Sequence, residues 1–454
     1  MELLTLQQHR DRIANIRYAE EHVKGYLQRI RVHDYIPGQV IYNLGEYPAG
    51  FSIQPTEYDY NLIKKLAEKG VGLIQLHEEW NDGIRKLGAD KFSSHDPAGL
   101  KAFIRLCHDF GIKVIPYVST GFFDVRDPDF KENFTRNKVA LNGAHYRYRL
   151  CNAASPEWNT YVMQKIAGIL DEYEFDGLYN DMGYDGEEVA PENWGNWPEE
   201  IPYNPYWEDM LARVYSLVKE KGGIYKIHQG ACLRPNTKEK IYDYLWVGEC
   251  VESSEAILRT AAFDPYVIVC PDYRFMEGKD GESLFAKTLP FMQFVLRVDG
   301  RPVTGERIAV PGVDYVIDKE TVFYQKVWEY HKAHPEGPHV YSEWSTIPDD
   351  VKQRADWFKY LDLYKPMVKE NSVAFVDISE NTIVQGKLPK DVHMSLFINE
   401  KRYLCMSNLG EKTAKVELRE CWHDRQTDTT VKTVQLQPGS ICFLENTEAN
   451  IRIN

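Results

Sequence analysis

Short apolar runs alternate with helix-like segments along most of the chain, from about residue 38 to about residue 300. Segments 58–70, 96–111, 157–174 and 207–222 have the apolar spacing of helices. The strand-like runs are QVIYNLG (39–45), VGLIQLHEEW (71–80), IKVIPYVSTG (112–121), FDGLYNDMG (175–183), IYKIHQG (224–230), YLWVGEC (244–250), PYVIVC (265–270) and FMQFVLRV (291–298). This repeated alternation predicts an α/β fold with a parallel sheet closed into a (β/α)₈ TIM barrel. A doubly wound open sheet is the alternative, because the connection from the fifth run to the sixth is short.

The pattern changes at both ends of the chain. Residues 5–31 have one apolar stripe among many charges, which predicts an amphipathic helix. Beyond residue 370, short β-type segments such as VAFVDI and SICFLEN are separated by polar turns and predict an antiparallel β-sandwich. We therefore expect an N-terminal helical segment over 1–36, a barrel over 37–369 and a C-terminal β-sandwich over 370–454.

Composition and charge narrow the classes of partner. The 454-residue chain is 43% hydrophobic and carries a formal net charge of -14. This charge argues against nucleic-acid binding, which normally needs a basic face, and against attraction to anionic membranes. No apolar run approaches the ~20 residues needed to span a bilayer.

The cysteines and the N-terminus bear on localisation. The eight cysteines include no CxxC pair, and several lie in apolar runs, so we expect them to be reduced and buried. The first residues lack the apolar core of a signal peptide. Both features favour a cytoplasmic protein, although a secreted or periplasmic protein whose signal peptide had been removed would look the same.

Acidic and aromatic residues gather where the predicted strands end. The relevant segments are HEEW (77–80), YVSTGFFD (117–124), YNDMGYD (179–185), HQGACLR (228–234), WVGEC (246–250) and CPDYR (270–274). In a barrel these ends meet on one rim, where active sites form. Carboxylates bind hydroxyl groups and transfer protons, and flat rings stack on sugar faces, so the rim predicts an oligosaccharide or glycoside as substrate.

Two strand-end acids are the candidate catalytic pair. Asp181 follows the buried part of the fourth strand, and Glu249 follows that of the sixth. Glycoside hydrolysis requires two carboxyl groups that flank the bond, which fits this placement. A helix cap or a surface ion pair is the alternative for either acid alone, and Asp176 at the strand start is expected to be structural.

Further residues on the rim are candidates for substrate binding. They are His77, Glu78, Glu79, Trp80, Tyr179, Asn180, His228, Arg234, Trp246, Asp272 and Arg274. Asp272 is also a second candidate for the acid. The sequence contains no phosphate loop, GxGxxG or HExxH motif, so we predict neither a metal nor a cofactor.

Four segments resemble parts of known α-glycosidases. FDGLYNDMG (175–183) resembles the nucleophile strand of retaining α-glycosidases, above all the α-glucosidase and α-xylosidase group of family 31. YLWVGEC (244–250) resembles the sixth strand of that group, which ends in a Trp-x-Gly-acid pattern. Residues 95–118 are similar to its third βα unit, and LHEEW (76–80) is similar to the second strand of the related α-galactosidases.

The resemblance implies roles for individual residues. Asp181 would be the nucleophile, Glu249 the acid/base, and Glu78 or Glu79 with Trp80 would hold substrate hydroxyls. The family 31 acid is an aspartate, whereas Glu249 resembles the Asp/Glu pairing of dextranases.

A second departure concerns the residue before the nucleophile. The α-galactosidases carry a lysine there, where this chain has Asn180. The implied activity is retaining hydrolysis of an α-glycosidic bond. The alternatives are a transglycosylase that uses the same site and a barrel that binds carbohydrate without cleaving it.

Overall fold

The computed structural model describes residues 30–32, 35–45, 52–81, 92–125, 127–142, 147–181, 203–228, 237–239, 241–247, 257–258, 260, 268–271, 281–301, 351–369, 372–378 and 383–446. Every structural statement below concerns these residues. Within these ranges, no helix is both long enough and apolar enough to cross a membrane.

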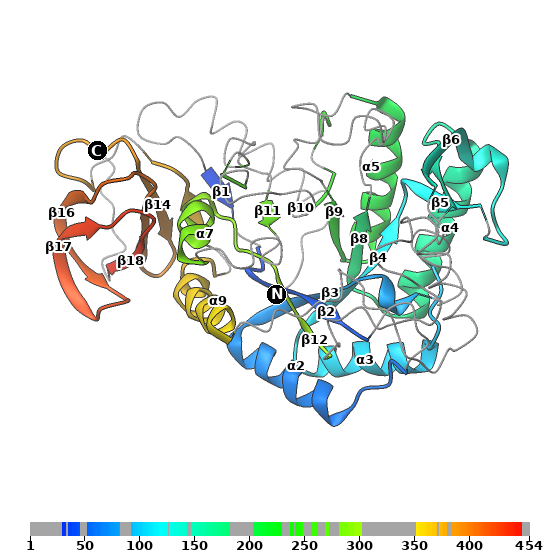
Figure 1. Ribbon diagram of the computed structural model, residues 1–454, viewed down its shortest axis with the longest axis horizontal. Coiled ribbons are helices and arrows are strands. Elements are labelled where there is room, and N and C mark those ends of the chain that lie inside the picture. The colour runs from blue at the N-terminus through cyan, green and yellow to red at the C-terminus, as the bar shows by residue number, and fades with distance from the viewer. Residues whose placement is uncertain are drawn as a thin grey trace, which may run out of the picture.

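An eight-stranded parallel sheet forms the centre of the molecule (Figure 1). Its strands, in spatial order, are β11 (Ile268–Pro271), β10 (Tyr244–Val247), β9 (Ile224–His228), β8 (Gly177–Asp181), β4 (Lys113–Ser119), β3 (Val71–Leu76), β2 (Gly38–Asn43) and β12 (Arg297–Gly300). The backbone N–H of Leu296 donates to the carbonyl of Pro271 at 2.6 Å, which joins the last residue of β11 to the residue before β12. The sheet is therefore curled on itself as a barrel, and the open-sheet alternative is wrong.

The eighth strand begins later than its apolar run predicts. Leu289–Phe291 forms a short 3₁₀ helix, η8, and Met292 has a left-handed backbone with φ 58°. These two features turn the chain before it can extend, so β12 starts only at Arg297. The boundaries predicted from FMQFVLRV (291–298) are therefore wrong, although a strand does follow that run.

Helices α2 (Glu57–Lys69), α3 (Pro97–Asp109), α4 (Pro156–Glu172) and α5 (Pro205–Glu220) are among those that cover the outer face of the sheet. Each begins after a residue whose side-chain oxygen accepts a backbone N–H of the first turn. These N-caps are Thr56, Asp96, Ser155 and Asn204. Proline in the first turn fixes the helical φ angle without losing a hydrogen bond, which further defines the starts of α3, α4 and α5.

Gly177 lets β8 lie against β9. Its φ is 141°, and a Cβ atom built on it would lie 1.8 Å from the carbonyl oxygen of Ile224. No other residue type fits that space without moving the backbone. Asp176, just before it, accepts from the backbone N–H of Val114 at 2.8 Å and binds His108 Nε2 at 2.7 Å. The expected structural role of Asp176 is thereby confirmed.

A three-stranded sheet is inserted between β4 and α4, and the apolar pattern did not predict it. It consists of β5 (Phe122–Asp124), β6 (Thr135–Asn142) and β7 (Arg147–Cys151). The rings of Phe123 and Phe134 each lie 5.5 Å from the ring of Trp158 in α4. Aromatic packing therefore attaches this small sheet to the barrel.

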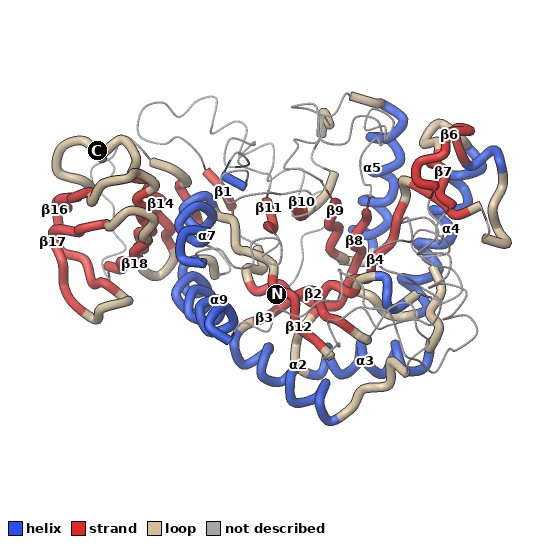
Figure 2. Tube along the Cα trace, in the orientation of Figure 1, coloured by secondary structure: helices blue, strands red, loops and turns tan. Residues whose placement is uncertain are grey.

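The C-terminal part is an antiparallel β domain, as predicted (Figure 2). Its strands are β13 (Val373–Phe375), β14 (Val392–Ile398), β15 (Arg402–Asn408), β16 (Ala414–Asp424), β17 (Thr429–Leu436) and β18 (Ile441–Asn446). One face buries its own core around Met406, Leu418 and Trp422. The other face packs on helix α9 (Val351–Tyr364), beside α7 (Gly281–Thr288), and continues the core of the barrel.

The end of the predicted N-terminal helix is a strand instead. Ile30–Val32 forms β1, which pairs antiparallel with β13. The β-branched residues Ile30 and Val32 favour an extended backbone when a partner strand is available. Residues 5–29, the remainder of the predicted helix, lie outside the described residues.

Most of the described cysteines are buried, as the apolar runs predict. Cys107, Cys151, Cys270, Cys405 and Cys442 are buried free thiols, and burial raises the pKa of each. Cys421 is exposed on β16, so the expectation of burial is wrong for that residue.

Candidate active site

Asp181 is the last residue of β8, at the end of the barrel where parallel strands finish. Side chains alternate along a strand, so Tyr179 and Asp181 face the barrel interior while Asn180 faces outward. The Asp181 side chain is only 15% exposed. The carboxylate is thus largely enclosed and keeps a limited opening.

Two side chains hold the Asp181 carboxylate. The hydroxyl of Tyr117 on β4 donates to Oδ2, and Nδ1 of His228 at the end of β9 lies 2.5 Å from Oδ1. An ionised carboxylate only accepts hydrogen bonds, so His228 acts as a donor here through Nδ1. Donors on both oxygens fix the plane of the carboxylate and stabilise its negative charge.

Aromatic rings from five neighbouring strands or strand ends surround this carboxylate. The His77 ring lies 5.8 Å from that of Tyr117 and 5.7 Å from that of Tyr179. The Trp246 ring lies 5.7 Å from that of Tyr179 and 4.2 Å from that of His228. All five rings are buried, so their packing gives the site a rigid apolar wall.

The structure brings together five of the predicted site residues, namely His77, Tyr179, Asp181, His228 and Trp246. It adds Tyr117, which lies in the predicted rim segment 117–124 but was not among the predicted site residues. Tyr117 pairs directly with Tyr179 across the sheet, so both side chains point into the barrel. This inward direction is the sequence feature that could have identified Tyr117. A long ring at that register reaches the carboxylate at the end of the next strand.

Asn180 does not reach the site. Its Nδ2 donates to the hydroxyl of Tyr225 at 2.7 Å and to that of Thr120 at 2.9 Å. Tyr225 packs on Tyr215 of α5, which places this contact in the layer between sheet and helices. The prediction that Asn180 binds substrate is therefore wrong; its side chain joins β4, β8 and β9 from behind.

Trp80 is also a core residue. Its Nε1 donates to the carbonyl of Tyr117 at 2.9 Å, and its ring lies 5.5 Å from that of Phe175 and 6.0 Å from that of Tyr173. The side chain is fully buried, so it cannot stack on a sugar. Glu78–Trp80 forms a 3₁₀ turn, η1, in which Glu79 is buried as well.

Four predicted site residues lie outside the described residues: Arg234, Glu249, Asp272 and Arg274. Strand β10 ends at Val247, two residues before Glu249, and Trp246 on that strand contacts His228. The role predicted for Glu249 remains a prediction.

A buried polar layer lies beneath the site. Lys226, one inward position below His228 on β9, donates through Nζ to Oε1 of Gln39 at 2.6 Å, and the Cys270 thiol is 3.7 Å from the same oxygen. Burial raises the pKa of Cys270 to about 11, although the nearby Lys226 charge opposes that rise. The cysteine is therefore a neutral thiol, and this layer supports the barrel interior below the site.

Solved structures resemble this fold. No protein-family model matches the chain, and no curated protein matches its sequence. An α-glucosyl transfer enzyme is 11% identical with a TM-score of 0.54, over 90% of this chain and 99% of that one. A GH36 α-galactosidase from Geobacillus stearothermophilus is 9% identical with a TM-score of 0.53, over 90% and 55% of the two chains.

A maltogenic α-amylase from Thermotoga neapolitana is 13% identical with a TM-score of 0.51, over 90% of this chain and 97% of that one. At such low identities the likeness is one of fold. Barrel glycoside hydrolases that act on α-linked sugars thus share this architecture, and the resemblance to family 31 in particular stays a prediction.

Proposed function

We propose that the protein is a retaining glycoside hydrolase that cleaves an α-glycosidic bond. The observation that carries the proposal is the Asp181 carboxylate, fixed at a strand end by Tyr117 and His228 and enclosed by aromatic rings. The fold it shares with an α-amylase and an α-galactosidase supports the same reaction class.

The reaction proceeds in two steps. In the first, an Asp181 oxygen forms a bond to the anomeric carbon while the bond to the leaving oxygen breaks, and Glu249 gives that oxygen its proton. In the second, Glu249 takes a proton from water, which attacks the anomeric carbon and releases Asp181. Each step inverts the configuration of the anomeric carbon, so after both steps the sugar has its original α configuration.

Tyr117 and His228 act by orientation. A nucleophile whose plane is fixed before the substrate binds loses less entropy when it attacks. Their hydrogen bonds also stabilise Asp181 when it departs as a carboxylate in the second step. Tyr117 on β4 and His228 on β9 thus each contribute one hydrogen bond to Asp181 on β8.

The substrate class is an oligosaccharide or glycoside. The α-galactosidase named above was solved with 1-deoxygalactonojirimycin, and another similar structure, 10% identical with a TM-score of 0.52, was solved with maltose. The rings around Asp181 are themselves buried, so they hold the carboxylate in place and do not stack on the sugar.

Transglycosylation is the second candidate. The fold likeness to an α-glucosyl transfer enzyme favours it, and the chemistry differs only in the acceptor. A sugar hydroxyl would replace water in the second step. Product analysis at high glycoside concentration separates the two, because a transglycosylase forms longer products.

A panel of aryl α- and β-glycosides tests the proposal with the wild type, Asp181→Asn and Glu249→Gln. We expect α-glycosides alone to be cleaved, and Asp181→Asn to lower kcat/KM by a factor on the order of 10⁴. Glu249→Gln should slow poor leaving groups strongly and 2,4-dinitrophenyl glycosides little, because the latter need no proton.

Asp176→Asn is the matched control, since that acid lies just before the same strand and binds His108 at the opposite end of it from Asp181. It should leave kcat/KM within about twofold, as expected for a residue outside the reaction. Undiminished activity in Asp181→Asn would reject the nucleophile. No activity on any glycoside, with sugar binding retained, would favour a binding barrel instead.

A further inference from the structure

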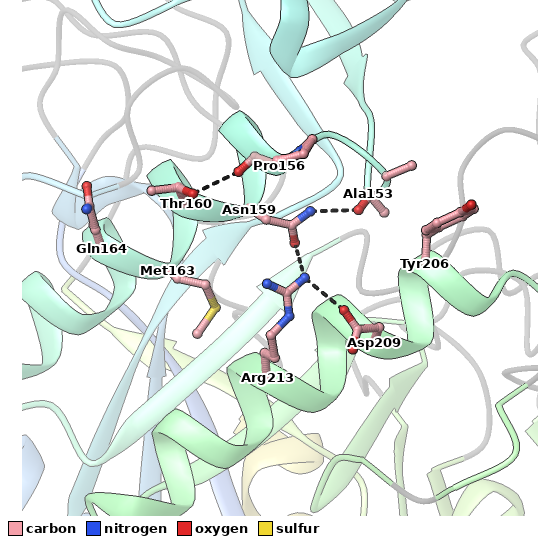
Figure 3. Close-up of a pocket in the computed structure, with 10 residues that line it drawn as sticks. Ala153, Pro156, Asn159, Thr160, Met163, Gln164, Tyr206, Asp209 and Arg213 are labelled. Carbon is pink, nitrogen blue, oxygen red and sulfur yellow. Dashed lines mark hydrogen bonds and ion pairs between the residues drawn. The ribbon is translucent and has the colours of Figure 1, made fainter.

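A groove of about 690 Å³ runs between α4 and α5 on the outside of the barrel (Figure 3). Both helices run back along strands that precede them, so their first turns lie at the same end of the barrel as Asp181. The residues that line the groove include neither Asp181 nor its partners Tyr117 and His228. The groove is therefore separate from the candidate active site.

An exposed aromatic ring stands at one side of this groove. Tyr206, in the first turn of α5, is 59% exposed, the highest value among the large hydrophobic side chains described. The side-chain oxygen of Asn204 accepts its backbone N–H at 3.0 Å, which fixes the turn that carries the ring. A ring held in water offers a flat apolar face to a ligand.

Polar groups of fixed geometry follow the ring along α5, one and two turns further on. Arg213 donates through Nη2 to Oδ1 of Asn159 at 2.7 Å and to Oδ2 of Asp209 at 2.9 Å. This leaves Nη1 and Nε of the guanidinium and one oxygen of Asp209 without a partner among the described residues. The Gln164 side chain is exposed on the facing helix, α4. The groove thus offers planar donors and acceptors together.

The charged side chains in the groove favour a neutral ligand over an ionic one. Arg213 is paired with Asp209, so the wall carries no net charge, and an anion would meet the carboxylate. Vicinal hydroxyl groups match a fixed pair of donor and acceptor, and the C–H face of a pyranose ring matches Tyr206. The volume is in the range of sites for small molecules.

We propose that this groove is a second carbohydrate-binding site, which holds a neutral pyranose oligosaccharide against Tyr206. The inference rests on the proposed function, because that function supplies the ligand class. Two sites on one molecule raise the local concentration of a polymeric substrate at the barrel. Substitutions in the groove should therefore weaken the binding of a polymer but leave the hydrolysis of a small aryl glycoside unchanged.

Native gels that contain soluble starch, dextran or galactomannan test this inference. At least one polymer should retard the wild type, and Tyr206→Ala should weaken the apparent affinity about tenfold, the effect of losing one stacked ring. Arg213→Gln should weaken it as well. Tyr60→Ala is the matched control, because Tyr60 is an exposed tyrosine in the first turn of another helix, and it should migrate like the wild type.

Thermal unfolding of each variant separates lost binding from lost folding. Three results would each exclude the groove as a binding site. They are wild-type retardation of Tyr206→Ala, no retardation of the wild type by any polymer, and a loss of polymer affinity in Tyr60→Ala as large as that in Tyr206→Ala. Asp181→Asn should still be retarded fully. Undiminished hydrolysis in that variant would reject the catalytic proposal but leave the gel result intact, so the two failures can be told apart.

Discussion

Two carboxylates with similar partners have different surroundings in this molecule. Asp181 receives a tyrosine hydroxyl and a histidine, and Asp59 in α2 receives a tyrosine hydroxyl and an arginine. The Asp59 side chain is completely buried, whereas that of Asp181 keeps 15% of its surface open. The two carboxylates therefore differ in solvent exposure and in their basic partner, which is a histidine for Asp181 and an arginine for Asp59.

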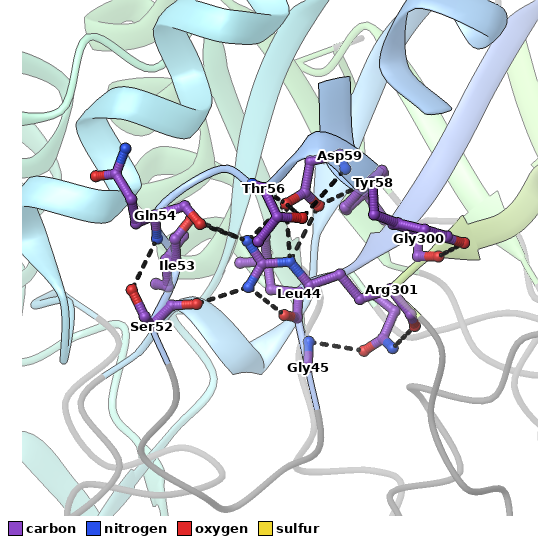
Figure 4. A network of polar contacts seen from close by, with 12 residues as sticks. Leu44, Gly45, Ser52, Ile53, Gln54, Thr56, Tyr58, Asp59, Gly300 and Arg301 are labelled. Carbon is purple, nitrogen blue, oxygen red and sulfur yellow. Dashed lines mark hydrogen bonds and ion pairs between the residues drawn. The ribbon is translucent and has the colours of Figure 1, made fainter. Parts of the chain in front are cut away.

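The arginine in the Asp59 network connects separate segments of the fold (Figure 4). Arg301, next to the end of β12, binds both oxygens of Asp59 at 2.9–3.2 Å. Its remaining donors bind the carbonyls of Leu44, Ser52, Ile53 and Gln54. The arginine is always charged and fully bonded, so this carboxylate is structural.

The pKa of Asp59 reflects the same network. Burial alone would raise the pKa, but the hydrogen bonds from Arg301, Thr56 and Tyr42 outweigh burial and lower it. Asp181 instead binds the phenol of Tyr117 and the imidazole of His228. An acid held by weaker donors and open to a ligand is suited to chemistry rather than support.

Breaking the Asp59 network should give the largest effect on stability. Asp59→Ala leaves Arg301 buried without its anion, which should lower the free energy of unfolding by about 3–5 kcal/mol. Urea denaturation at pH 7 measures the change, and Asp171→Ala, which removes an exposed partner of Lys221, should cost less than about 1 kcal/mol. Equal stability of both variants would show that Asp59 is not structural.

This stabilisation also depends on pH. The pKa of Asp59 is lower in the folded state than in the unfolded state, so the stabilising effect is complete above about pH 4 and is lost as the pH falls through the folded-state value. The wild type should lose this advantage over Asp59→Ala in acid.

Removing one donor from Asp181 should affect activity more than stability. Tyr117→Phe deletes a hydrogen bond to a charged group, worth about 1.5–3 kcal/mol, so kcat/KM should fall by about 10- to 100-fold. Steady-state kinetics on the best aryl glycoside measures it. Tyr225→Phe on β9 is the matched control, because its hydroxyl binds Asn180 behind the sheet; a loss of activity as large as that of Tyr117→Phe would contradict the assignment.

The third carboxylate to compare is Asp176, at the opposite end of β8. Its hydrogen bond to His108 raises the pKa of that histidine, although partial burial opposes the rise. The stabilisation is therefore complete below the ordinary histidine pKa of about 6.5 and is lost as the pH rises through the folded-state value.

His108 is about a third exposed, so solvent screening limits the effect to less than about 1 kcal/mol. Urea denaturation at pH 5.5 and pH 8.5 should show a larger loss of stability for the wild type than for His108→Gln. The same pH dependence in both proteins would exclude this ion pair as its source.

The architecture was largely readable from the sequence. Strand β8 lies within the predicted run 175–183, and α2 begins one residue from its predicted start. Apolar runs report burial, and burial determines the layers of a barrel. The inserted sheet β5–β7 was missed because β6 carries polar residues that give no strand pattern.

The candidate site was readable only in part. Position at a strand end identified Asp181 and His228, since that position depends on the fold alone. Side-chain direction depends on the pleat, and the alternation of side chains places Asn180 behind the sheet. Tyr117 was missed because its reach depends on the register between β4 and β8, which sequence does not specify.

Labelling of the nucleophile tests the central claim most directly. The wild type would be incubated with the 5-fluoro glycosyl fluoride of the sugar that the aryl-glycoside panel identifies, digested, and analysed by mass spectrometry. We expect one glycosyl unit on the peptide that contains Asp181, and none in Asp181→Asn. A label on another carboxylate, or turnover that inverts the anomeric configuration, would contradict this claim.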